Sequence, residues 1–412
     1  MLIKPDKLDK SPIKNNKFML YYMLEGRIEM KKALKNLDKP LLIISIILFS
    51  IGLVMVFSAS NVTAYMSHAV SPYNYFLKQS LFLLSGVILC SIMVCFSTKT
   101  YGRFSRLLMI IFIALLAIVF ITAEEKNQAK SWIDLGFFSL QPSEFIKVIT
   151  IIWLSYYYDK KTRLKKEDTY LRSLYPLLIC IVPALLTFIQ PDLGTTIIYV
   201  LIVALIFSAS PISKIIKSKI FFVGVGGVVF IGLILLGSGV ELINARQLQR
   251  FDFFRPCDKL LDTGSQVCNG YIAINNGGLT GVGLGNSTQK YLYLPEPYTD
   301  FIYAIIVEEL GVIVGIIILL LYMVLLYRIL MIGRKSFTTR GALICYGVAG
   351  YIFIHIAVNL TGMFGLFILT GVPLPFMSYG GSFTWSLLGA LTLVQRVNIE
   401  NRLEEQGELK CQ

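Results

Sequence analysis

Two carboxylates stand four residues apart, immediately before a long apolar run. Glu296 and Asp300 flank Pro297, and Asp300 directly precedes the run that begins at Phe301. Proline suits the first turn of a helix, so Asp300 is expected near the N-terminus of a helix, where the helix dipole favours an ionised carboxylate. Such a group can act as a general base, although capping a helix is the commoner role for an acid in this position.

A glycine-rich run precedes these acids. It extends from Gly277 to Gly285 and continues through Asn286 to Lys290. Glycines allow backbone amides to approach an anionic group such as a diphosphate closely. The same run would also make a tightly turning linker, and the sequence leaves both interpretations open. Dinucleotide binding is not favoured, because no predicted strand precedes the run.

The composition places these residues in a membrane protein. Of 412 residues, 55% are hydrophobic and 15% are charged, and the mean hydropathy is +0.69, which is too apolar for an ordinary soluble chain. Runs long enough to span a bilayer must be helical, so we expect an all-α, polytopic membrane protein with about ten transmembrane helices. The ten runs are 40–60, 76–96, 107–123, 142–158, 174–189, 193–210, 220–237, 301–327, 342–363 and 383–394.

The basic residues predict the orientation of these spans. With ten spans, 29 of the 38 Lys and Arg fall on the side of the two termini, and cytoplasmic segments carry this excess in membrane proteins. Both termini are therefore expected in the cytoplasm. The net charge of +13 then reflects topology rather than nucleic-acid binding. We expect a disordered N-terminal tail (1–39), a ten-helix domain (40–397) with one large extracellular loop (238–299), and a C-terminal tail (398–412).

Polar groups within the apolar runs are expected to have partners or functions. Glu144 and Lys147 are three residues apart and can pair across one helical turn. Glu308 and Glu309 need polar partners, and Asn359 is the residue we consider for this role. Asp192 is expected to cap the sixth span. The segment 370–382 contains two prolines and three glycines and is predicted to be an irregular hairpin packed against protein.

Two of the seven cysteines fall in the large loop. Cys257 and Cys268 would face an environment that can be oxidising, and the sequence leaves open whether they form a disulfide or remain free thiols. The spacing of Cys and His does not match a zinc site. His68 and His355 are isolated in the sequence and are interpreted as structural residues.

In combination, these motifs resemble the SEDS family of shape, elongation, division and sporulation proteins. The resemblance covers the chain from Pro40 to Val397. It rests on five segments: 131–136 with Gln141 to Glu144, 190–195, the glycine run through Lys290, 294–304, and the PLPF and SYGGS elements within 373–382. Departures from the family pattern stand at four positions: Ser131, Tyr298, Ile368 and Phe383. Within the family, the chain looks more like the division branch and its Gram-positive members.

The resemblance implies a peptidoglycan glycosyltransferase that polymerises lipid II outside the cytoplasmic membrane, at the division septum. Asp300 matches the essential loop aspartate of the family and Glu296 the preceding glutamate; both are taken as catalytic. Expected substrate-binding residues are Lys130, Arg246, Arg250, Gln289, Lys290, Ser378, Gly380 and Gly381. A divalent cation, Mg²⁺ or Mn²⁺, held by Glu296 is a further option for neutralising the leaving diphosphate. Expected partners are the lipid-linked glycan, a class B penicillin-binding protein and other membrane proteins of the divisome.

Two alternatives from other functional classes remain open. A lipid II flippase would use Glu144, Lys147, Glu308 and Glu309 to line a polar path across the membrane. A non-catalytic division scaffold would need none of the carboxylates. The polar residues concentrate in one outer loop, which favours the enzyme.

Overall fold

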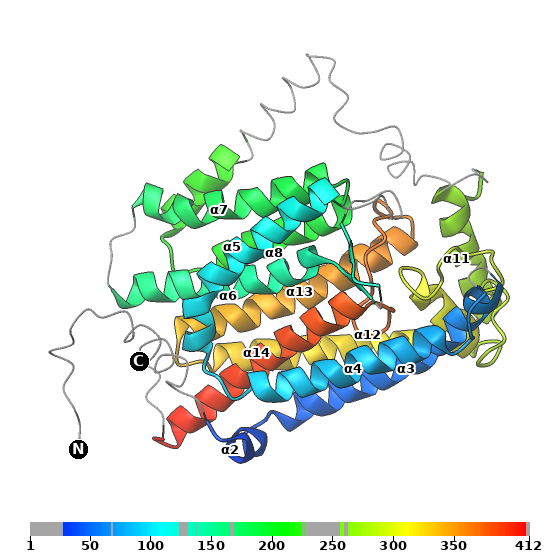
Figure 1. Cartoon of the computed structure of the whole chain (residues 1–412), viewed down its shortest axis with the longest axis horizontal. Coiled ribbons are helices and arrows are strands. Elements are labelled where there is room, and N and C mark those ends of the chain that lie inside the picture. The colour runs from blue at the N-terminus through cyan, green and yellow to red at the C-terminus, as the bar shows by residue number, and fades with distance from the viewer. Residues whose placement is uncertain are drawn as a thin grey trace.

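The computed structural model describes residues 28–66, 69–122, 131–136, 138–164, 169–224, 226, 256–258 and 263–408. Helices dominate these residues, and the one sheet among them is the two-stranded antiparallel pair of β1 (Ile133–Asp134) and β2 (Ser139–Leu140). The all-α fold class expected from composition is confirmed. The helices run roughly along one direction and form an elongated bundle (Figure 1).

Nine long helices of the bundle correspond to nine of the ten predicted spans. They are α3 (Lys39–Met66), α4 (Asn74–Met93), α5 (Thr98–Thr122), α6 (Pro142–Arg163), α7 (Tyr170–Ile189), α8 (Leu193–Ala209), α12 (Ile302–Arg334), α13 (Thr339–Met363) and α14 (Gly381–Glu405). The seventh predicted span (220–237) lies mostly outside the described residues, and residues 214–224 are helical.

The bundle has a central group of helices and an outer group. Among the described residues, six helices are long and apolar enough to cross a membrane: α3, α4, α5, α7, α12 and α13. In the apolar 18-residue stretch of α13, 78% of the residues are buried, whereas in that of α4 only 17% are buried. α13 packs against α6, α8, α12 and α14 and so lies at the centre. The outer helices expose leucine and isoleucine, as lipid-facing surfaces do, and the protein is a multi-pass membrane protein.

The two ends of the bundle differ. We call one the termini end: it holds α2 (Met30–Lys35) and the last turns of α14 (Figure 1). We call the other the loop end: it holds α11 (Thr263–Gly277), the glycine run and the segment 364–380 (Figure 1). The short 3₁₀ helix η1 (Pro256–Asp258) packs on α11.

The predicted tail boundaries need correction at the termini end. Residues 30–35 form α2 rather than a disordered tail, because Ala33 is buried with Cys95 and Leu403. α14 continues to Glu405, well beyond the predicted end of the last span. Arg396 is fully buried in this extension and donates to Glu400, so a charged helix is tolerated inside the bundle.

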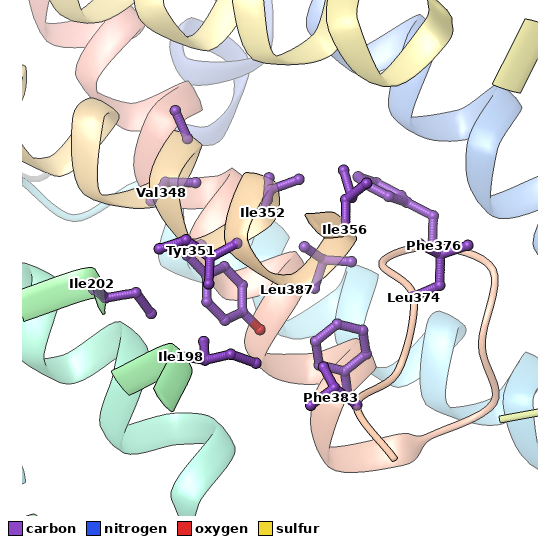
Figure 2. Packing of buried hydrophobic residues seen from close by; sticks show 14 of the residues in the cluster. Ile198, Ile202, Val348, Tyr351, Ile352, Ile356, Leu374, Phe376, Phe383 and Leu387 are labelled. Atoms are coloured by element: carbon purple, nitrogen blue, oxygen red, sulfur yellow. The ribbon is translucent and has the colours of Figure 1, made fainter. Parts of the chain in front are cut away.

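Buried side chains from α8, α13, α14 and the segment before α14 form one continuous core. Ile198 and Ile202 of α8 face Tyr351 of α13, and Leu374 and Phe376 turn toward Ile356 (Figure 2). The irregular segment is therefore anchored by its apolar side chains against the helices, as predicted for residues 370–382.

Candidate functional site

Asp300 lies in a turn at the loop end, two residues before α12. The turn is closed by bonds from the Thr299 backbone nitrogen (3.1 Å) and hydroxyl (2.8 Å) to the carbonyl of Glu296. The Thr299 hydroxyl also contacts Asp300 Oδ1 at 3.0 Å. Glu296 and Asp300 are both partly exposed. The expected pair of carboxylates is therefore held on one short turn.

The eighth span was predicted to begin at Phe301, and the structure confirms this start to within one residue. α12 begins at Ile302 with Phe301 as its N-cap, so Pro297 lies before the helix and not in its first turn. Glu296 has φ +46°, a left-handed conformation that few side chains adopt and that is often found at functional sites. Asp300 thus precedes the helix instead of capping it, and it still lies close to the positive end of the helix dipole.

The segment 370–380, which we call the hairpin, is bonded directly to this turn. Ser378 donates its hydroxyl to the carbonyl of Thr299 and accepts from the Leu374 amide at 2.8 Å. The Tyr379 amide donates to the carbonyl of Tyr298 at 2.9 Å. Two segments about eighty residues apart in sequence therefore form one structural unit around Asp300.

Gly371 of the hairpin faces the carboxylate of Asp300. Its φ is +65°, and a Cβ at this position would lie 3.8 Å from Asp300 Oδ2. A glycine here keeps a side chain from packing against Asp300 Oδ2. A substrate hydroxyl would have to approach this carboxylate to transfer a proton to it.

Three tyrosines pack around the turn. The ring of Tyr298 lies 4.6 Å from that of Tyr75 and 5.8 Å from that of Tyr379. Burial, together with the neighbouring Tyr75, raises the pKa of Tyr379 to about 12. Burial, the hydrogen bond with Tyr75 and the nearby Glu296 also raise the pKa of Tyr298. Both phenols are therefore neutral near pH 7 and supply no base beside Asp300.

Ser378, Gly380 and Gly381 were expected to bind substrate, and the structure gives them packing roles. Ser378 is buried and both of its hydroxyl contacts are to backbone. The Gly380 amide donates to Gln79 at 3.2 Å. A Cβ on Gly381 would lie 2.7 Å from the ring of Phe82. These contacts give all three residues a role in positioning the hairpin. Gly380 and Gly381 are partly exposed, and their expected contact with substrate stays a prediction.

The glycine run packs against a break in α12. Gly311 has φ 86° and ψ 163°, which interrupts the helix and frees the carbonyls of Glu308 and Glu309. The run supplies their new donors: Val282 N to Glu308 O at 2.9 Å and Gly283 N to Glu309 O at 3.0 Å. In return, the amides of residues 312 and 313 donate to the carbonyls of residues 278 and 279.

This packing decides between the two interpretations of the glycine run. A Cβ on Gly277 would lie 2.1 Å from the carbonyl of Val307, and one on Gly281 2.3 Å from that of Glu309. The glycines at these two positions are thus required for close contact between two backbones. The diphosphate cradle is not supported there, because the amides of Val282 and Gly283 are used by α12.

We predict that Gly281→Ala destabilises the protein more than Gly285→Ala. Both glycines have positive φ, +81° and +84°, so an alanine is strained at either position. Only Gly281 has a neighbour within 4 Å. The steric clash should add about 1–3 kcal/mol for Gly281→Ala. Unfolding of both variants in detergent, followed by circular dichroism, measures the difference; equal losses would contradict the close packing.

Lys290 was expected to bind the diphosphate, and its charge is instead used inside the protein. The side chain is 1% exposed. Its Nζ donates to Glu309 Oε1 at 3.0 Å and to the carbonyl of Gly285 at 2.6 Å. Ser58 of α3 donates to the same carboxylate at 2.6–2.7 Å. Gln289 is also buried, and its backbone N–H donates to Glu308 Oε2 at 3.4 Å.

The predicted partner for the two intramembrane glutamates was wrong. Glu308 accepts from the hydroxyls of Ser287 and Thr288. Asn359 does not contact these glutamates: its Nδ2 donates to the carbonyls of Asp300 and Val372, both at 2.8 Å. The sequence indicated that Asn359 had a polar task, and only the packing of α13 identifies its partners.

Glu144 and Lys147 form the expected pair on α6. Lys147 Nζ lies 2.8 Å from Glu144 Oε1, and both side chains are buried. His355 of α13 joins them, with its Nε2 3.1 Å from Lys147 Nζ. No pattern in the sequence indicates this third member, because it comes from a helix about two hundred residues away. Asp192 caps α8 as predicted, accepting from the Thr195 amide at 3.1 Å.

Two of the remaining predicted residues are the cysteines of the large loop. Cys257 and Cys268 are joined by a disulfide that links η1 to α11. Lys130, Arg246 and Arg250, expected to bind the diphosphate, lie outside the described residues, as does His68.

The described residues contain no group of three or more His, Cys, Asp or Glu that would enclose a metal ion. Mg²⁺ is commonly bound by one or two carboxylates together with phosphate oxygens of the substrate. The partly exposed Glu296 and Asp300 fit that limited requirement, with the substrate supplying the other ligands.

A helical membrane bundle with a carboxylate turn fixed by a PLPF hairpin matches one known class of protein. The family model described as "Cell cycle protein", which comprises FtsW, RodA and SpoVE, matches residues 39–403. The chain belongs to this family.

Curated relatives and solved structures agree with this membership. The chain is 34% identical over 391 residues to the "Probable peptidoglycan glycosyltransferase FtsW" of Bacillus subtilis, covering 92% of this chain and 95% of the relative. It is 36% identical to the "Stage V sporulation protein E" of the same organism, covering 89% and 98%.

Two solved chains share the fold. A chain from the structure described as "Structural coordination of polymerization and crosslinking by a peptidoglycan synthase complex" has a TM-score of 0.69 at 22% identity, covering 89% of this chain and 98% of that one. The rod shape determining protein RodA of Thermus thermophilus has a TM-score of 0.60 at 23% identity, covering 88% and 96%.

Proposed function

We propose that the protein is a peptidoglycan glycosyltransferase that polymerises lipid II, with Asp300 as the general base. The observation that carries this proposal is the position of Asp300: it is partly exposed on a turn at one end of a membrane bundle, and the hairpin is bonded to that turn. Family membership and relatives named as glycosyltransferases support the class of reaction.

The chemistry follows from what a carboxylate can do at this place. The 4-hydroxyl of one sugar attacks the anomeric carbon of another and gives its proton to Asp300. A bond forms between that oxygen and the anomeric carbon, while the bond from the carbon to the diphosphate breaks. Undecaprenyl diphosphate leaves, and the anomeric configuration inverts from α to β. A positioned base accelerates such a step by about 100- to 10,000-fold.

The leaving diphosphate needs positive charge. With Lys290 paired to Glu309, the basic residues that remain from the sequence analysis are Lys130, Arg246 and Arg250. A divalent cation bound by Glu296 and the substrate would neutralise charge on the diphosphate in the same place.

We further propose that the loop end faces outward and that both termini are cytoplasmic. Basic side chains concentrate at the termini end, where α6 ends in Lys160, Lys161 and Arg163. Positive charge on the cytoplasmic side is the general rule for membrane proteins. This orientation places Asp300 where the lipid-linked sugar is polymerised. The family and the FtsW relatives support a role at the division septum.

A class B penicillin-binding protein is the proposed partner. One neighbouring fold comes from a peptidoglycan synthase complex. We expected the partner's membrane helix to pack near the eighth or ninth span. α13 is largely buried, whereas α12 exposes Ile316, Leu320 and Met323, so α12 is the better surface.

Reconstitution with lipid II tests the proposed function. Proteoliposomes containing the protein, the transpeptidase and fluorescent lipid II should yield a ladder of glycan polymers on a gel. Parallel vesicles with a chelator report whether the reaction requires a divalent cation. Translocation of lipid II without polymer would instead indicate a flippase, and neither activity would indicate a scaffold. The three glutamates and one lysine proposed for a flippase path are buried, which favours the first outcome.

A further inference from the structure

We propose that Asn359 is a positioning residue for Asp300. The inference rests on the proposed function, in which Asp300 is the base. Asn359 Nδ2 donates to two backbone carbonyls, those of Asp300 and Val372, each at 2.8 Å. Both protons of a single amide group are thereby used, one on the carboxylate turn and one on the hairpin.

The position of Asn359 in the fold allows it to connect a buried helix to the site. The side chain is 5% exposed and comes from α13, the most buried of the apolar spans. It therefore connects a rigid central helix to the two irregular segments that meet at Asp300. An uncharged amide with two donors suits two carbonyl acceptors, and an aspartate would present an oxygen to both of them.

Neighbouring residues on α13 support the same arrangement. His355, one helical turn earlier, packs on Phe383 with ring centroids 4.9 Å apart. Ile356 lies beside the hairpin residues Leu374 and Phe376 (Figure 2). This face of α13 thus fixes the hairpin with apolar contacts, while Asn359 supplies the polar contact to the Asp300 backbone.

The hairpin provides a second connection to the turn that is independent of Asn359. The Ser378 hydroxyl binds the carbonyl of Thr299, the residue before Asp300. Consecutive carbonyls of the turn are therefore bound by two side chains from different segments. Loss of one contact leaves the turn attached but allows Asp300 to move, and a displacement of about 1 Å at a catalytic group can lower a rate 100-fold.

The test measures kcat and KM for lipid II in the full-length protein with its transpeptidase. We expect Asn359→Ala to lower kcat by about 100-fold with KM within a factor of about two, because the substrate contacts remain. Thr361→Val is the matched control, since within the described part of the chain the Thr361 hydroxyl donates to carbonyls of its own helix, those of Ala357 and Val358. It should leave both constants unchanged.

Two additional measurements keep the inference testable if Asn359→Ala does not fold. Asn359→Gln retains the amide on a side chain one methylene longer and should lower kcat less than alanine does. Hydrogen exchange should increase in peptides covering 296–303 and 370–380 in the Asn359 variants, and not in Thr361→Val. Wild-type kcat and wild-type exchange in Asn359→Ala, or in the near-isosteric Asn359→Leu if the alanine variant does not fold, would overturn the inference, because both variants lack the two amide donors. A raised KM with unchanged kcat in these variants would also overturn it.

The outcomes separate this inference from the proposed function. If Asp300→Asn is inactive while the Asn359 variants have wild-type kcat, only the positioning role fails. If Asp300→Asn polymerises lipid II at the wild-type rate, the role of Asp300 as base fails first.

Discussion

Asp300→Asn is expected to abolish glycan polymerisation while the protein still folds and inserts. The amide has nearly the same shape as the carboxylate, so the contact from the Thr299 hydroxyl and the backbone bond from Asn359 can persist. What is lost is the ability to accept a proton, and the rate should fall by about 100- to 10,000-fold. Gel analysis of the polymer made from lipid II measures this loss.

The control for Asp300→Asn is Glu405→Gln. Glu405 is an exposed carboxylate on α14 at the termini end, so the same change of acid to amide is made far from the turn. Polymerisation by this variant should equal that of the wild type. An Asp300→Asn variant as active as Glu405→Gln would show that the carboxylate is not needed.

Lys290→Met is expected to destabilise the protein severely through Glu309. Lys290 and Glu309 form a buried pair, with side chains 1% and 0% exposed. Removing one member leaves an uncompensated buried charge, which costs about 3–5 kcal/mol. In detergent, the variant should therefore unfold at a much lower temperature or denaturant concentration than the wild type. The specific activity of the fraction that remains folded should change much less.

The double variant Lys290→Met with Glu309→Gln distinguishes a structural role from substrate binding. It removes both charges, and the glutamine keeps an acceptor for the Ser58 hydroxyl. Most of the lost stability should return. If Lys290→Met were as stable as the wild type and instead raised KM for lipid II, Lys290 would bind the diphosphate after all.

The sequence predicted the elements whose signals are local. Long apolar runs located nine described spans, and Asp192 was recognised as the cap of α8 because a cap acts within three residues. The prolines and glycines of 370–382 predicted an irregular hairpin for the same reason. Helix ends were less accurate, since α14 continues through Arg396 and Glu400 where hydropathy predicts that it stops.

The roles of the polar residues could not be predicted, because their partners are distant in the sequence. Lys290 pairs with Glu309 and contacts Ser58 across 232 positions. Asn359 binds carbonyls at Asp300 and Val372, and a backbone acceptor has no signature in a sequence. The break at Gly311 also escaped prediction, since an isolated glycine within an apolar helix is ordinary.

The sequence predicted which residues belong to the site but not how they are arranged in space. Spacing and position made Glu296 and Asp300 candidates, and the family resemblance implied their catalytic role. The residues expected to assist them, Ser378 and Lys290 among them, turned out to support the backbone instead. Polar residues near a catalytic turn serve both purposes, and only their burial separates those that contact substrate from those that hold the turn.

Chemical rescue of Asp300→Ala tests the role of Asp300 most directly. The turn is partly exposed, so a small carboxylate such as formate can reach the space left by the deleted side chain. The rate of glycan formation from lipid II should be negligible without formate and should rise in proportion to its concentration. A rate that does not respond to formate, whether it stays near zero or equals that of the wild type, would contradict proton transfer to Asp300.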